Sequence, residues 1–121
     1  MEIKKEKKDK KLDLFVDGAI DTTTSSTLET EVFKEIKGIN ELCIDLSDTN
    51  YVSSAGLRVF LKIHKYMNSN GGKFVIKNPR EEVMEVFDMT GFSTFLTIEE
   101  WFYEHQSFFD NGRIWFKPEC L

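Results

Sequence analysis

DLSDTNYVSSAGLRVFLKIHKYMN, residues 45 to 68, contains the clearest change of pattern in the chain. The apolar run Leu42–Leu46, which is typical of a buried strand, leads into it. A polar corner and the pair Ser53 and Ser54 follow, and from Leu57 to Met67 the apolar residues recur at helical spacing. The pattern therefore predicts a strand that delivers two serines to a helix N-terminus, where unpaired backbone N–H groups favour an anion.

The segment DLS-x-x-x-YVSSAGLRVF closely resembles the signature of STAS domains, and among them of the bacterial anti-sigma factor antagonists. The resemblance extends over residues 1–100 and implies an α/β, STAS-like fold. It also implies a phosphorylation-controlled module that, when unphosphorylated, binds an anti-sigma factor that doubles as a serine kinase. Binding would release a sigma factor, and a serine phosphatase would reverse the modification, which is partner switching.

The resemblance also assigns the candidate site. In this family the serine two residues before the signature glycine accepts the phosphate, which is Ser54 when counted back from Gly56; Ser53 is the second choice. As alternatives, Ser54 is an N-cap serine and Asp21 a turn or cap aspartate, and for Ser54 both roles can coexist. The predicted partner-binding residues lie in the loop before the first helix and in the first turns of the second: Asp21, Thr22, Thr23, Ser53, Ser54, Ala55, Gly56, Arg58 and Lys62.

Three cations of the second helix, Arg58, Lys62 and Lys65, gather opposite its apolar face when the residues are placed at 100° steps. Such a stripe either keeps the helix soluble or docks onto an acidic partner. We favour docking, because the stripe leads directly from the serines. His64 lies on the apolar side and is expected to be a packed histidine.

Strands alternate with helices along the chain, in the order β-β-α-β-α-β-α-β-α. Right-handed crossovers then predict a mixed, mostly parallel sheet with an N-terminal β-hairpin. Residues 1–100 form the STAS domain, and residues 101–121 are a C-terminal helix and aromatic extension packed on it. The predicted strands are 1–8 and 12–17, which form the hairpin, then 42–46, 73–77 and 92–98, and an extra strand 113–117. The first predicted helix is capped by Ser26, or by a residue from 23 to 25, and ends at Gly38, and the second follows Ser54. The third is capped by Asn78 and ends at Gly91, and the last is capped by Thr97.

Composition narrows the function classes. The chain has 121 residues, 40% of them apolar, and a net charge of −5, which argues against nucleic acid as a partner. We expect no membrane insertion, because the sequence has no apolar run of about 18 residues, and no signal peptide in the charged N-terminus. Cys43 and Cys120 have no partner at metal-ligand spacing, so reduced thiols in the cytoplasm and no metal or cofactor are expected.

Catalysis is not expected. A serine before a helix superficially resembles a nucleophile elbow, but that motif is G-x-S-x-G and position 52 is Val52. His64 and His105 give no pattern of an oriented base. The alternative to an anti-sigma factor antagonist is a STAS subunit of a lipid-transport or stress-signalling complex, which would use the same helix surface without a sigma factor.

Overall fold

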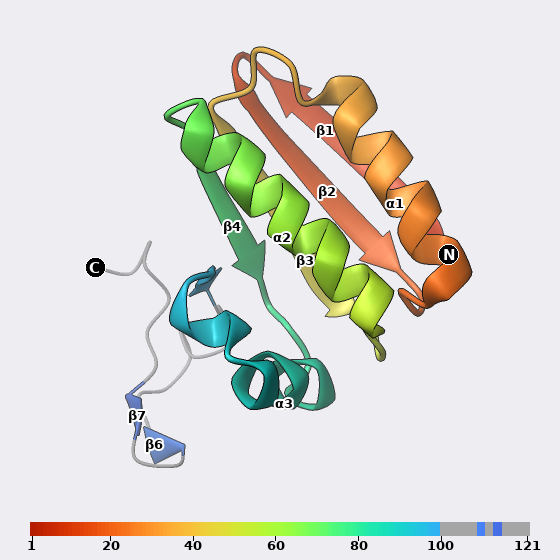
Figure 1. Cartoon of the computed structure of the whole chain (residues 1–121), viewed down its shortest axis with the longest axis vertical. Coiled ribbons are helices and arrows are strands. Elements are labelled where there is room, and N and C mark those ends of the chain that lie inside the picture. Colours follow the sequence, from red (N-terminus) through yellow and green to blue (C-terminus); the bar gives the residue numbers. More distant parts are fainter. Residues whose placement is uncertain (100–108, 111–112, 115–121) are drawn as a thin grey trace.

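A computed structural model describes residues 1–99, 109–110 and 113–114 of the chain (Figure 1). Within these residues the order of elements agrees with the predicted order as far as the last strand of the sheet. The elements are β1 (Glu2–Lys8), β2 (Lys11–Asp17), α1 (Thr22–Glu35), β3 (Glu41–Asp48), α2 (Ser54–Ser69), β4 (Lys73–Lys77), α3 (Glu81–Thr90), the 3₁₀ turn η1 (Phe92–Thr94), β5 (Thr97–Glu99), β6 (Phe109–Asp110) and β7 (Arg113–Ile114).

Five strands form one sheet in the order β1-β2-β3-β4-β5. β1 pairs antiparallel with β2, and the other three pairings are parallel, which confirms the mixed sheet with an N-terminal hairpin. The parallel strands follow each other in one direction across the sheet, so right-handed crossovers bring their helices to the same face. Figure 1 shows α1 and α2 side by side across that face.

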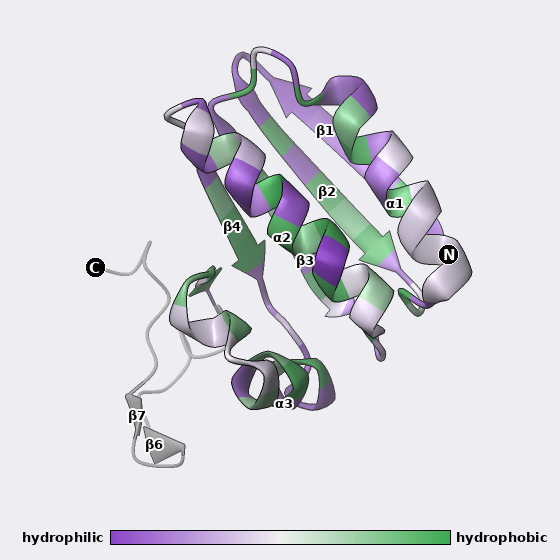
Figure 2. Ribbon diagram, viewed as in Figure 1, coloured by the Kyte–Doolittle hydropathy of each residue, from purple (hydrophilic) through white to green (hydrophobic). Residues whose placement is uncertain are grey.

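The core lies between the sheet and the helices. Alternate residues of β2 and β3 point into it, so that Leu12, Leu14 and Ile44 are fully buried. Phe60 of α2 packs edge-on against Phe87 of α3, with ring centroids 5.9 Å apart. Figure 2 shows the apolar residues of β2 and β4 under the helices, and polar residues along the outward side of α2. The buried faces of the strands and of the helices, each marked by its own periodicity in the sequence, thus form one core.

The start of α1 differs from the prediction. The helix begins at Thr22 with Asp21 as its N-cap, five residues before the start that a cap at Ser26 would give. The carboxylate of Asp21 accepts hydrogen bonds from the N–H groups of Thr23 and Thr24, and Thr24 completes a capping box. The later hydroxyls join the helix instead of capping it, as when Ser25 donates to the carbonyl of Thr22 at 3.0 Å.

The predicted cap of the third helix was also wrong. α3 begins at Glu81, and its N-cap is Arg80, which makes no capping hydrogen bond through its side chain. Asn78 instead adopts a left-handed conformation with φ of 54°, and its side-chain amide donates to Asp45 at 3.0 Å. Asn tolerates this conformation better than most residues, so it turns the chain at the end of β4 rather than starting the helix.

The last strand of the sheet is shorter than predicted. Gly91 closes α3 in a left-handed conformation, as expected, but Phe92–Thr94 form a 3₁₀ turn and only Thr97–Glu99 join the sheet as β5. The aromatic residues before β5 pack with one another instead: the rings of Phe92 and Phe95 lie 5.0 Å apart, and that of Phe95 lies 4.9 Å from His64. His64 is therefore a packed histidine.

The region after Glu99 is described only in part. β6 pairs antiparallel with β7, with Asp110 opposite Arg113, so the predicted extra strand does begin at Arg113. The predicted cap of the final helix was wrong, because Thr97 is the first residue of β5. The other residues of that helix, the rest of the extra strand and Cys120 lie outside the described residues. The packing of residues 101–121 on the domain therefore stays a prediction.

Candidate functional site

Two loops at the carboxyl ends of neighbouring strands are joined by backbone hydrogen bonds. One follows β2 and the other follows β3, and Ile20 and Val52 form an isolated parallel bridge between them. The N–H of Ile20 donates to the carbonyl of Tyr51, and the N–H of Ser53 donates to the carbonyl of Ile20, both at 2.8 Å. These long-range bonds place the N-termini of α1 and α2 next to each other and fix the surface between them.

The two serines have different positions. Ser53 is the N-cap of α2: its hydroxyl accepts a hydrogen bond from the N–H of Gly56 at 3.2 Å, and it is only 8% exposed. The alternative that Ser54 is the cap is therefore wrong. Ser54 is the first residue of the helix, it is exposed, and its hydroxyl makes no hydrogen bond within the described part of the chain. Of the two, Ser54 is the hydroxyl that another protein can reach.

Close packing explains why position 56 is a glycine. A Cβ atom at this position would lie 2.8 Å from Cγ2 of Ile20 and 3.0 Å from Cγ1 of Val52, closer than real contacts allow. The absence of a side chain lets α2 start directly against the bridge between the two loops. The glycine of the signature thus sets where Ser54 emerges, while Gly56 itself is buried.

Asp21, Thr22 and Thr23 lie exposed at the start of α1. Asp21 is a cap, as one of the two alternatives had it, and it still reaches the surface. The N–H of Thr24, and then its hydroxyl, hold the pKa of Asp21 below its ordinary value. Asp21 therefore offers a constant negative charge beside the serines, and its contact with a partner remains a prediction.

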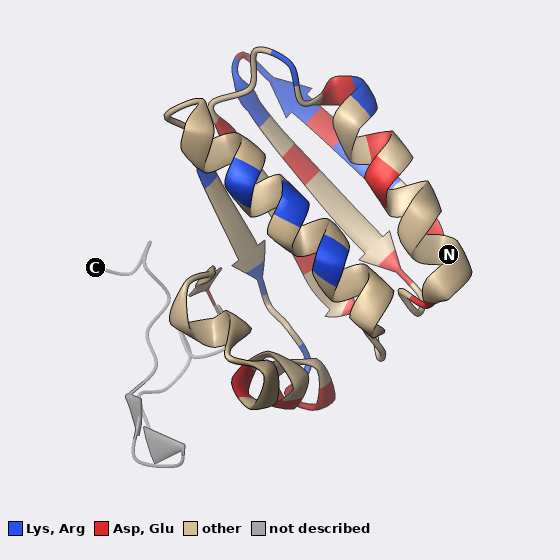
Figure 3. Cartoon of the chain, in the orientation of Figure 1, with Lys and Arg blue, Asp and Glu red and all other residues tan. Residues whose placement is uncertain are grey.

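The cations of α2 are not equivalent. Figure 3 shows them in a row along the outward side of the helix. Lys62 reaches across to α1, where its Nζ lies 2.7 Å from Oε2 of Glu29, so part of its charge is already neutralised. Arg58 is exposed, has no ion pair among the described residues, and lies four positions after Ser54, on the same side of the helix. Arg58 is thus the better candidate for binding an acidic group.

Tyr51 is a candidate site residue that was not predicted from the sequence. It is 53% exposed although it is a large aromatic residue, and its carbonyl takes part in the bonds between the loops. An exposed tyrosine is a common anchor in protein interfaces. The available signal was its place between Asn50 and the inward-pointing Val52, which turns the side chain outward.

The described residues offer neither a metal site nor a membrane-spanning helix. They contain no group of three or more His, Cys, Asp or Glu side chains placed to hold a metal ion. None of their helices combines the length and the apolar character that crossing a bilayer requires. The exposed groups next to Ser54 are hydroxyls, a carboxylate, a phenol and a guanidinium, which suit recognition of another protein.

Residues 2–106 match the STAS domain. The chain belongs to the STAS domain family. Among similar proteins, the putative anti-sigma factor antagonist BtrV of Bordetella bronchiseptica is 32% identical over 93 residues, which cover 76% of this chain and 80% of BtrV. The anti-sigma-B factor antagonist of Bacillus subtilis is 30% identical over 81 residues, covering 67% of this chain and 74% of that protein.

Solved structures agree with this STAS assignment. The crystal structure of a putative anti-sigma factor antagonist from Thermotoga maritima superposes with a TM-score of 0.78 at 26% identity, covering 85% of this chain and 90% of that one. The anti-sigma factor antagonist SpoIIAA in its unphosphorylated form gives a TM-score of 0.74 at 14% identity, covering 86% and 91%. At that identity the likeness to SpoIIAA shows the shared fold alone.

Proposed function

We propose that this STAS protein is an anti-sigma factor antagonist that works by partner switching in the cytoplasm. Unphosphorylated, it binds an anti-sigma factor that is also a serine kinase, and a sigma factor is released. Phosphorylation of Ser54 ends the binding, and a serine phosphatase restores it. The observation that supports this most is the exposed, unbonded hydroxyl of Ser54 at the first position of α2, beside the buried cap Ser53.

The start of α2 can accept a phosphate without unfolding. Phosphate adds about −1.5 to −2 charges near neutral pH, and Ser54 lies where the helix dipole and unpaired N–H groups favour negative charge. Arg58, one turn further on, can approach the same phosphate. The modification would then take Arg58 away from an acidic partner and place an anion in the interface.

Binding rather than catalysis also fits the position of the nearest histidine among the described residues of α2. His64 is ten residues after Ser54, which corresponds to roughly 15 Å along a helix, and its ring packs against Phe95. A general base for a serine nucleophile must come within hydrogen-bond reach of it. Ser54 therefore suits a substrate of a kinase better than a nucleophile.

The test is incubation with ATP and the purified anti-sigma factor encoded in the same genome, followed by mass spectrometry. Phosphate is expected on Ser54 in the wild type and in Ser53→Ala, and in neither position in Ser54→Ala. Phosphate found only on Ser53 would contradict the assignment. Failure of every anti-sigma factor of that genome to bind would favour the alternative, a STAS subunit of another assembly.

A further inference from the structure

The hairpin of β1 and β2 has one side that the helices do not cover. Side chains alternate along a strand, and Lys5 points to the helix side, because its Nζ lies 2.6 Å from Oε1 of Glu31 on α1. Its neighbours therefore point the other way, where no helix of the described residues lies (Figure 1). We call this surface the hairpin face; it consists of Glu2, Lys4, Glu6 and Lys8 of β1 and Lys11, Asp13, Phe15 and Asp17 of β2.

The hairpin face contains like charges directly opposite each other. In the register of β1 and β2, Glu2 pairs with Asp17, Glu6 pairs with Asp13 and Lys8 pairs with Lys11. Such pairs destabilise a sheet, so an isolated chain gains nothing from them. The two outermost pairs make one end of the face acidic and the other end basic, and the acidic pair of Glu6 and Asp13 lies between them, next to the basic end.

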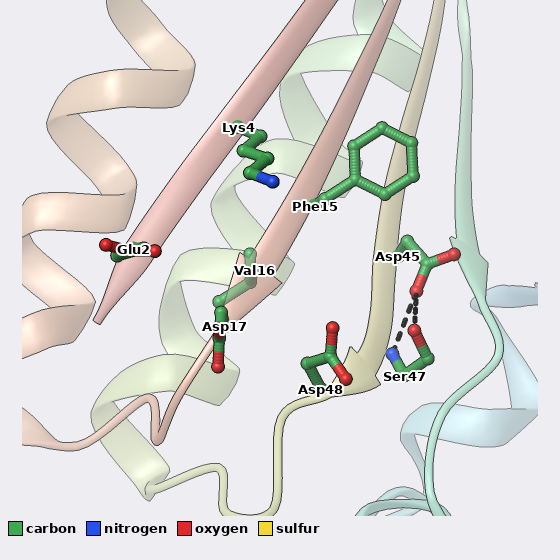
Figure 4. Close-up of a pocket in the computed structure, with 8 residues that line it drawn as sticks. All are labelled: Glu2, Lys4, Phe15, Val16, Asp17, Asp45, Ser47 and Asp48. Carbon is green, nitrogen blue, oxygen red and sulfur yellow. Dashed lines mark hydrogen bonds between the residues drawn. The ribbon is translucent and has the colours of Figure 1, made fainter.

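The acidic end is hollowed. A cavity of about 210 Å³ is bounded by Phe15, which is 40% exposed, together with acidic side chains from β1, β2 and β3. Figure 4 shows these side chains on the near side of the strands, with the helices behind. The hollow can receive long cationic side chains, and the basic end of the same face carries two of them. The full lining is Glu2, Lys4, Phe15, Val16, Asp17, Asp45, Ser47 and Asp48.

We propose that the hairpin face binds the hairpin face of a second copy of this chain, with the strands of the two copies antiparallel. A two-fold axis between the sheets and perpendicular to the strands places β1 on β1 and β2 on β2 in reversed directions. Lys8 and Lys11 of each copy then face Glu2 and Asp17 of the other. Each of the two outermost like-charge pairs meets a pair of opposite charge, and each hollow receives two lysines.

In the middle of the face, one of the two kinds of contact is between opposite charges. Under this axis Glu6 of each copy faces Lys4 of the other, while Asp13 faces Phe15. An axis parallel to the strands would instead place acidic end on acidic end and basic end on basic end, which charge repulsion disfavours. The charge pattern therefore selects one orientation, which makes the interface self-complementary.

The area of the hairpin face limits the expected affinity of the dimer. Strands of about seven residues, rising about 3.3 Å per residue and about 4.8 Å apart, give β1, β2 and β3 together roughly 350 Å². Each partner of a standard stable interface buries about 800 Å². We therefore expect a weak dimer, with a dissociation constant of roughly 10 to 1,000 µM, that dissociates further as salt rises from about 0.05 to about 0.5 M.

Charge reversal at Glu2 and Lys8 tests the dimer. Lys8→Glu and Glu2→Lys each remove a like-charge pair within one chain, so neither change should lower the thermal stability of dilute protein. Each nevertheless places like charges across both halves of the dimer, and dimerisation should weaken about tenfold or more. Sedimentation equilibrium up to about 1 mM protein measures this, and Lys37→Glu, which changes a cation away from the hairpin face, is the control.

A mixture of the two variants is the sharpest experiment. When Lys8→Glu and Glu2→Lys chains pair with each other, both contacts are again between opposite charges, so the mixture should dimerise although neither variant does so alone. A wild type that stays monomeric at about 1 mM, or a dimer that neither variant weakens, would overturn the proposal. The result is independent of the proposed function, because it needs no anti-sigma factor.

Discussion

Removing the cap hydroxyl of Ser53 separates the roles of the two serines. In Ser53→Ala the N–H of Gly56 loses its acceptor at 3.2 Å, in a place where Ser53 and Gly56 are both buried and water cannot easily replace it. Loss of a serine cap costs about 1 kcal/mol, and up to about 2 kcal/mol where the donor is left unsatisfied. Ser54→Ala removes an exposed hydroxyl without a hydrogen bond among the described residues, so its cost should stay within about 0.5 kcal/mol.

Urea unfolding followed by helical circular dichroism measures both costs. Ser53→Ala should lower the free energy of unfolding by about 1 to 2 kcal/mol, which is roughly 3 to 8 °C in Tm for a domain of this size. Ser53→Asp is the matched control, because aspartate caps a helix as well as serine does. Equal losses in Ser53→Ala and Ser54→Ala, or a larger loss in Ser54→Ala, would refute the assignment of Ser53 as the cap.

Three further predictions concern the surface around Ser54. In titration calorimetry against the anti-sigma factor, Arg58→Glu should weaken binding by about 1 to 3 kcal/mol if Arg58 meets a desolvated acid. Lys37→Glu, in the turn that follows the C-terminus of α1, should leave the affinity unchanged, and equal affinities of the two variants would exclude Arg58 from the interface. The pKa of Asp21 is lowered from its ordinary 3.8, so the stability that its carboxylate contributes is complete above pH 3.8 and is lost as pH falls through the lowered pKa. Asp21→Asn keeps a cap but no ionisable group, so its free energy of unfolding should fall less than that of the wild type as the solution is acidified. An identical fall in both proteins would contradict the pKa shift. Gly56→Ala gains about 1 kcal/mol of helix propensity, but its methyl group would lie 2.8 Å from Cγ2 of Ile20, and such overpacking costs about 1 to 3 kcal/mol. Urea unfolding should therefore show a net loss of up to about 2 kcal/mol in the free energy of unfolding. A variant more stable than the wild type would show that this contact relaxes freely.

Much of the fold was predictable because it depends on local periodicity. The two-residue alternation of β2 and the helical spacing after Leu57 each require one buried face, and that requirement fixes both the type of element and its inward side. The strand 73–77 was predicted at both ends because a short apolar run, residues 74–76, lies between two lysines. Gly91 marked the end of α3 because glycine readily adopts the left-handed conformation found there.

The starts of the helices were not predictable in the same way. The six residues after Asp21 are all Ser or Thr, every one of which can cap, and Ser53 and Ser54 are adjacent and chemically identical. The choice between them depends on contacts between segments far apart in sequence, such as the bonds from Ile20 to the loop after β3. The ion pair of Lys62 with Glu29 is another such contact, and periodicity along one helix cannot reveal it.

The most direct test of partner switching is the affinity of the anti-sigma factor for this protein with and without phosphate on Ser54, measured by titration calorimetry on samples whose circular dichroism spectra are compared. An anion buried against a partner that offers it no cation costs several kcal/mol, and a phosphate that pairs with Arg58 removes Arg58 from its contact with the partner. The phosphorylated protein should therefore bind at least about 100-fold more weakly while its spectrum stays the same. Equal affinity of the two forms would contradict the proposed switch, and a collapsed spectrum would show that the phosphate acts on folding instead.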